Sequence, residues 1–190
     1  MSRNQRRADI SAIDPDTAQA RVIAEVKDPA WIDLVAGVPT WSPAGELITH
    51  VIHENTHAIA INGEVVTPAN LQVDGIIGVD RDGITFSGSF EPTQSHIFWR
   101  GWGGEFEALT SEPGVHMART AGGTLLLISR TMASYELNVQ IKRDGATRTI
   151  SALNEKPDVD AKPEFLLLGE RKLQSALLLP QNREIGRAHV

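Results

Sequence analysis

Glycine-centred turns recur along the chain with a spacing near forty residues. In each copy a polar turn that contains a glycine precedes an apolar run with β-strand preference. These turn glycines are Gly45, Gly83 and Gly123, and successive ones are 38 and 40 residues apart. A second set of glycines ends a second apolar run in each copy. These are Gly63, Gly104 and Gly145, and successive ones are 41 residues apart. A third short run follows each of these. Repeats of this length with several strands each are typical of β-propeller blades.

The apolar runs themselves have β-strand patterns. Residues Ser134 to Lys142 alternate, with Leu137, Val139 and Ile141 on one face, which predicts a half-buried strand. The run "TLLLIS" at 124–129 is apolar on both faces and predicts a strand covered on both sides. The expected fold is all-β: an incomplete β-propeller of about three and a half four-stranded antiparallel blades. A meandering β-sandwich, which also has closely spaced strands, is the alternative.

The repeat predicts where each part of the chain lies. A partial propeller is expected over 1–162, with a half blade at 8–27 around a turn at Pro15-Asp16, and full blades at 39–69, 70–112 and 113–152. Because three and a half blades are too few to close a propeller ring, both ends of the chain are expected to be truncated. An apolar hairpin follows at 163–182. The last residues, 183–190, match no unit, and "EIGRAHV" reads as a translated sequencing adapter, so a non-native tail is expected there.

Composition narrows the class of protein. The formal net charge of -6 disfavours nucleic acid or an anionic membrane as a partner. The chain has no cysteine, which excludes disulfides and thiolate metal sites. No apolar stretch approaches the length of a membrane span, and "MSRNQRRADI" lacks the apolar core of a secretory signal. A cytoplasmic location is the expectation.

The segment "HENTH" matches the zinc-peptidase pattern H-E-x-x-H through His53, Glu54 and His57. That pattern needs a helix, which places the two histidines on one face. The β-branched residues before it and the Asn55-Thr56 pair instead predict a hairpin turn between two strands. In the repeat His57 corresponds to His96, where no such motif exists, and His50 could join His53 only on a helix or across a hairpin. We therefore expect no metal and no cofactor.

Other candidate sites also favour structural roles. The chain has no G-x-S-x-G nucleophile motif. The four tryptophans suit packing in the core or between blades better than a ligand cage: Trp31, Trp41, Trp99 and Trp102. Three aspartates are expected at turns, with calcium binding as the alternative: Asp74, Asp80 and Asp82. No catalytic residue is predicted in this chain, and its substrate-binding residues stay open.

The order of several segments resembles the prolyl oligopeptidase family, in its dipeptidyl peptidase IV-like branch. The similarity runs from about Ser2 to Gln181 and includes "VPTWSPAGEL", "NLQVDGIIGVDRDGITFSG" and "PEFLLLGERKLQSALLLP". The stretch with Gly114, His116 and Ala118, followed by the pair at 122–123, is similar to the penultimate part of that family's propeller. The hairpin at 163–182 is similar to the one that leads into its α/β-hydrolase domain.

The resemblance implies a propeller that admits short peptides to a hydrolase domain with a Ser-Asp-His triad. The partners it implies are peptide substrates and a C-terminal hydrolase domain of the same chain, with a homodimer possible in the parent enzyme. The triad is not carried over to this chain, and neither is the glutamate pair that grips the peptide amino terminus, because no adjacent glutamates occur. Two alternatives stay open: a free-standing propeller-like interaction module, and a zinc peptidase using "HENTH".

Overall fold

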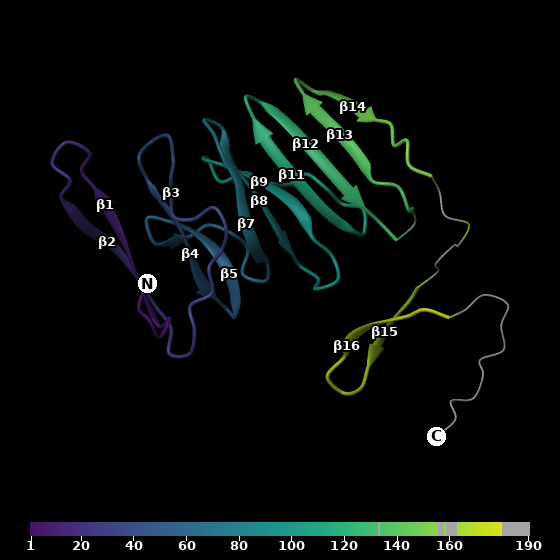
Figure 1. Ribbon diagram of the computed structural model, residues 1–190, viewed down its shortest axis with the longest axis horizontal. Coiled ribbons are helices and arrows are strands. Elements are labelled where there is room, and N and C mark those ends of the chain that lie inside the picture. The colour runs from purple at the N-terminus through teal and green to yellow at the C-terminus, as the bar shows by residue number, and fades with distance from the viewer. Residues whose placement is uncertain (133, 156–157, 159–162, 180–190) are drawn as a thin grey trace. The chain divides into compact units, whose positions relative to one another are not determined.

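The computed structural model describes residues 1–132, 134–155, 158 and 163–179 (Figure 1). The described residues form sixteen β-strands and no helix. Accordingly, this part of the chain contains no helix with the length and hydrophobicity to cross a membrane. The chain divides into two compact units, the first made of 1–90 and 97–109 and the second of 91–96 and 110–190.

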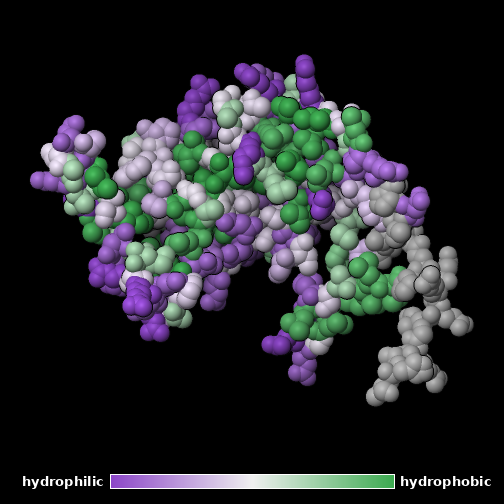
Figure 2. Space-filling model, in the orientation of Figure 1, coloured by the Kyte–Doolittle hydropathy of each residue, from purple (hydrophilic) through white to green (hydrophobic). Residues whose placement is uncertain are grey.

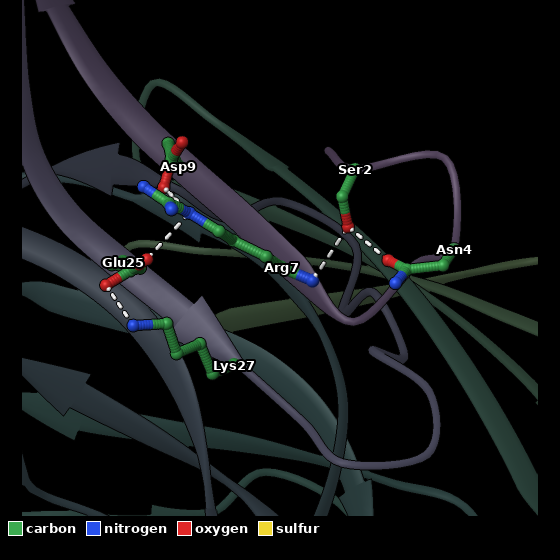
Figure 3. Close-up of polar contacts among 6 residues, drawn as sticks. All are labelled: Ser2, Asn4, Arg7, Asp9, Glu25 and Lys27. Carbon is green, nitrogen blue, oxygen red and sulfur yellow. Dashed lines mark hydrogen bonds and ion pairs between the residues drawn. The ribbon is translucent and has the colours of Figure 1, made fainter.

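The first unit opens with a two-stranded antiparallel hairpin, β1 (Arg7–Ile13) and β2 (Ala20–Lys27). Asp14 shapes the turn, because its Oδ1 accepts hydrogen bonds from the backbone N–H groups of Asp16 and Thr17, both at 2.9 Å. An ion pair joins the two strands, with Glu25 of β2 bound to Arg7 Nε of β1 at 2.7 Å; Glu25 also binds Lys27 Nζ of its own strand at 2.8 Å (Figure 3).

Two four-stranded antiparallel sheets complete this unit, each with its strands paired in chain order. The first consists of β3 (Thr40–Trp41), β4 (Leu47–His53), β5 (Thr56–Ile61) and β6 (Glu64–Val65). The second consists of β7 (Gln72–Val79), β8 (Gly83–Ser89), β9 (His96–Gly101) and β10 (Phe106–Ala108), with His96 assigned to the second unit. These are the four-stranded meanders that the repeat predicts.

The recurring glycines lie at equivalent turns of the sheets, for different physical reasons. Gly45 precedes β4 with a φ of +82°, which a side chain disfavours. Gly83 starts β8, where a Cβ would lie 2.2 Å from the carbonyl oxygen of Arg100. Gly123 precedes β12 (Thr124–Arg130) in the second unit. The period of about forty therefore marks the start of the second strand in each sheet.

The core of the first unit lies between its two four-stranded sheets, where β5 packs beside β7. Its buried residues come from both sheets, from the segment before β3 and from the link between β6 and β7: Val35, Ile48, Ile59, Leu71, Val73, Ile84, Phe86 and Phe98. Phe98 is central, with its ring centroid 5.7 Å from that of Phe86 and 5.5 Å from that of Phe106. Burial of this apolar surface is the main force that holds the sheets face to face.

The second unit contains a third four-stranded meander, β11 (Val115–Ala121), β12, β13 (Asn138–Arg143) and β14 (Ala146–Ile150). The strand predicted from Ser134 begins later, at Asn138. Its neighbour β12 ends at Arg130, and the last pair between them joins Ser129 to Asn138. Before that pair, Ser134 Oγ accepts a hydrogen bond from Glu136 N–H at 3.1 Å, a local contact that replaces strand pairing.

A second hairpin, β15 (Glu164–Leu168) and β16 (Leu173–Leu177), follows in the second unit. It is unusually apolar for an exposed element (Figure 2). Phe165 is 56% exposed and Leu167 is 58% exposed. The tail expected at 183–190 and the end of the hairpin predicted to reach 182 lie outside the described residues.

Candidate functional site

The segment "HENTH" is a hairpin turn between β4 and β5. His53 is the last residue of β4 and pairs with Thr56, while Glu54 and Asn55 occupy the turn with φ values of +48° and +67°. His57 pairs with Ile52, so it lies on the opposite face of the sheet from His53. The motif therefore lacks the one-faced helical geometry of a zinc peptidase, and no metal-binding group of three or more His, Asp or Glu occurs among the described residues.

The hairpin instead brings His57 beside His50. Both imidazoles lie on the same face, with ring centroids 5.5 Å apart. Asp33, from the segment between β2 and β3, places its Oδ2 3.4 Å from His57 Nε2, and its backbone forms a hydrogen bond with His50. Burial lowers the pKa of His50, and the neighbouring His57 lowers it further. The pair thus favours a neutral imidazole at His50.

His57 differs from its neighbour in one respect. Its Nδ1 is buried and has no hydrogen-bond partner, and it is the one such side-chain atom among the residues that the structure describes. The imidazole ring is 13% exposed, while the Asp33 carboxylate facing its other nitrogen is 77% exposed. Unsatisfied buried polar atoms are uncommon in proteins, so this one marks His57 as a residue with unused binding capacity.

A second pair of histidines, His96 and His116, lies in the second unit with stacked rings 5.2 Å apart. His116 is buried, and its ring nitrogens contact Ser129 Oγ and the carbonyl of Glu112, both at 2.8 Å. Because the carbonyl only accepts, Nε2 of His116 carries the proton. His96 contacts Thr110 Oγ1 at 3.1 Å, and burial is the first cause of its lowered pKa. These contacts give this pair a structural role.

Three cavities lie along the seam between hairpin β1–β2 and the first four-stranded sheet. Each is lined by both elements, and their volumes are about 290, 400 and 330 Å³. The smallest is mainly apolar and includes Ile10, Val38 and Pro39 in its wall. The 330 Å³ cavity is mixed and contains Trp31, Asp33 and His57. His50, Val26 and Ile32 line both of these cavities, so the two share a wall.

The structure corrects several residue assignments made from the sequence. Trp31 and Trp41 are 61% and 51% exposed, so the expectation that they are buried in the core or between blades was wrong for both. Trp99 is half-buried, and Trp102 does pack against the core. Trp31 belongs to the segment between β2 and β3, and Trp41 ends the two-residue strand β3; each lines a cavity of the seam.

The aspartates were assigned correctly at one place and wrongly at another. Asp80 is in a turn, where its Oδ1 accepts hydrogen bonds from the N–H groups of Asp82 and Gly83 at 2.9 and 3.0 Å. Asp74 was expected at a turn but lies within β7, where the pairing register with β8 shifts. The bulge there allows a polar residue inside an otherwise apolar strand.

Sequence reasoning missed the role of His50, His57 and Asp33 as one cluster. A signal for the histidine pair was present, because a two-residue turn at Glu54-Asn55 pairs Ile52 with His57, and His50 lies two residues before Ile52 on the same face. No comparable signal places Asp33 there, since its position depends on the path of a connecting segment.

Comparison with known proteins finds a likeness in structure. No protein-family model matches the sequence, and no curated protein matches it. Among solved structures, the chain is similar to the crystal structure of Porphyromonas gingivalis dipeptidyl peptidase 4, with a TM-score of 0.74 and 14% sequence identity. The match covers 94% of this chain and 28% of that chain. The all-β sheets described above are therefore those of an incomplete β-propeller, as predicted.

Proposed function

We propose that this chain is the propeller portion of a serine peptidase that hydrolyses short peptides, with a dipeptidyl-peptidase-like specificity. The observation that carries the proposal is the likeness in fold to a dipeptidyl peptidase over nearly all of the chain. The order of short segments along the chain resembles that of the same family, which agrees with the proposal.

In this proposal the chain controls which substrates reach the active site and takes no part in the chemical step. Its sheets form a rigid wall that restricts the approach of bulky substrates and leaves short peptides free to enter, while the nucleophile belongs to a hydrolase domain that follows in the full protein. Positioning of this kind lowers the barrier because the peptide is held near the reacting groups before attack. The packed aromatic core around Phe98 gives the wall the stiffness that such a role needs.

The apolar hairpin β15–β16 fits a contact with that hydrolase domain. A two-stranded hairpin is at best marginally stable alone in water, and this one exposes several large apolar side chains. Coverage by a following domain would remove this surface from water. The peptide substrates, the hydrolase domain and a homodimer are the partners that the proposal implies.

The test uses the complete reading frame that contains this chain. We expect the full protein to react with a fluorophosphonate probe and to hydrolyse Gly-Pro-p-nitroanilide, whereas the 190-residue chain does neither. Cleavage of short peptides is expected, with folded proteins left intact. Absence of fluorophosphonate labelling from a folded full-length protein would overturn the peptidase assignment. Cleavage of folded proteins as fast as peptides would overturn the gating role.

A further inference from the structure

We propose that the seam beside Trp31 and Asp33 is a binding site for an organic cation, an alkyl- or arylammonium group whose apolar part enters the adjoining cavity. The proposal does not depend on the peptidase assignment, since it rests on the cavities, charges and aromatic surface of the first unit. The 190-residue chain itself is therefore the material for its test.

The shape of the seam suits a small ligand with two different ends. The mixed cavity of about 330 Å³ and the mainly apolar cavity of about 290 Å³ share Val26, Ile32 and His50 as lining residues. Individually they are near the lower end of the size range of small-molecule sites, and together they are well within it. A ligand that fills both would place its hydrocarbon part among Ile10, Ile32 and Val38 and its polar group near Asp33.

The charges around the mixed cavity favour a cation. Three carboxylates line it, Glu25, Asp28 and Asp33, against one ammonium, Lys27. Glu25 is already bound by Lys27 and by Arg7 (Figure 3), whereas Asp33 faces only the imidazole of His57 and Asp28 accepts only backbone N–H groups among the contacts of the described residues. A concave surface with an excess of one charge raises the local concentration of the opposite ion.

Asp28 stays ionised because the fold stabilises its charged form. Its Oδ1 accepts hydrogen bonds from the backbone N–H groups of Trp31 and Ala30, both at 2.7 Å, and these contacts lower its pKa. The same contacts fix the backbone of Trp31 at the rim of the cavity. The carboxylate therefore both supplies charge and positions the aromatic residue.

Trp31 provides the aromatic surface that a cation prefers. Its side chain is 61% exposed although the following residue, Ile32, is buried and anchored by a backbone hydrogen bond to Gln5 at 2.8 Å. An indole face is the best side chain for a cation–π contact, and such contacts strengthen when the cation is partly desolvated. An exposed, backbone-fixed tryptophan beside carboxylates is suited to this contact.

His57 adds an acceptor that lacks a partner. Nε2 faces Asp33 Oδ2 at 3.4 Å, and in the tautomer that keeps a proton on that nitrogen Nδ1 is an acceptor. This nitrogen is buried and makes no hydrogen bond, although His57 lines the cavity. An ammonium group, which has donors and no acceptor, is the kind of ligand that would satisfy it.

The test is a titration of the 190-residue chain with 2-phenylethylammonium, followed by the imidazole proton signals in NMR. We expect saturable shifts of the His50 and His57 signals, with a dissociation constant of about 1 mM for a ligand this small. The neutral isostere 2-phenylethanol is expected to bind at least about fivefold more weakly, because it lacks the charge. Equal binding of the alcohol, or no saturable shift of either signal, would overturn the proposal.

Matched variants locate the site. Trp31→Ala and Asp33→Asn each remove an exposed group of the cavity and are expected to weaken ammonium binding about fivefold. Phe165→Ala and Asp16→Asn remove a similarly exposed aromatic ring and an exposed aspartate that line none of the three cavities, and they are expected to leave binding unchanged. If the control variants weaken binding as much as the first two, the ligand binds elsewhere and the assignment is wrong.

Discussion

Replacement of Phe98 by alanine is expected to be among the most destabilising changes in the first unit. Phe98 is 2% exposed and packs against three other aromatic rings, with centroid distances of 5.7 Å to Phe86, 5.7 Å to Phe90 and 5.5 Å to Phe106. The variant loses the transfer free energy of the ring, leaves a cavity, and breaks these aromatic pairs. A buried Phe→Ala change of this kind costs about 3–5 kcal/mol.

This cost is a large part of the stability of an ordinary domain, which is about 5–15 kcal/mol. With a denaturant slope of about 2 kcal/mol/M, a loss of about 4 kcal/mol lowers the urea midpoint by about 2 M. The assay is urea denaturation followed by the circular dichroism of the strands. An unchanged slope would show that the loss is one of stability and not of compactness.

Phe106→Ala is the matched control. Phe106 contacts the same cluster but is 39% exposed on the edge strand β10, so the change removes less buried surface and the neighbouring chain can relax into the space. We expect the free energy of unfolding to fall by about 1–2 kcal/mol, because the ring is only partly buried. If Phe106→Ala lowers the midpoint as much as Phe98→Ala, the core does not centre on Phe98 and the packing argument fails.

Three further results are expected. Gly83→Ala should destabilise the first unit by about 1–3 kcal/mol in the same urea assay, because the added Cβ meets the backbone carbonyl of Arg100; a neutral result would contradict that close approach. Stability should fall as pH drops below about 6.5, because burial lowers the pKa values of His50 and His96, so the unfolded chain binds protons that the folded chain excludes. His50→Gln should make the midpoint less sensitive to pH between about 5 and 7, and an unchanged pH profile would argue against a buried neutral His50. The isolated chain should self-associate in sedimentation velocity through its exposed apolar hairpin, and Leu167→Lys should reduce this association; a wild-type chain that sediments as a monomer would count against it.

Several features of the fold follow from local chemistry and were predictable for that reason. Turns with glycine are specified by a few neighbouring residues, so their stride of about forty was visible along the chain. The hairpin at "HENTH" was predictable on the same basis, since the β-branched residues before it disfavour a helix, although its turn residues are Glu54 and Asn55 and not the predicted Asn55-Thr56. The resemblance to a peptidase family also arose from the order of short segments, and the likeness in structure agrees with it at the level of fold.

Other features depended on neighbours distant in sequence. The strand β13 begins only at Asn138, where its pairing with Ser129 of β12 starts, although the alternation of apolar residues starts earlier. Trp31 is exposed because of the path of the segment between β2 and β3, and no hydrophobicity pattern encodes such a path.

The sequence by itself determined that this protein is built from repeated four-stranded sheets, because turn and strand preferences act over a few residues. Only the tertiary structure decided which polar groups meet. The cluster of His50, His57 and Asp33 joins two strands and a connecting segment, and the cavities beside it lie between a hairpin and a sheet. Such sites depend on cross-strand register and on the packing of separate elements, which local preferences do not specify.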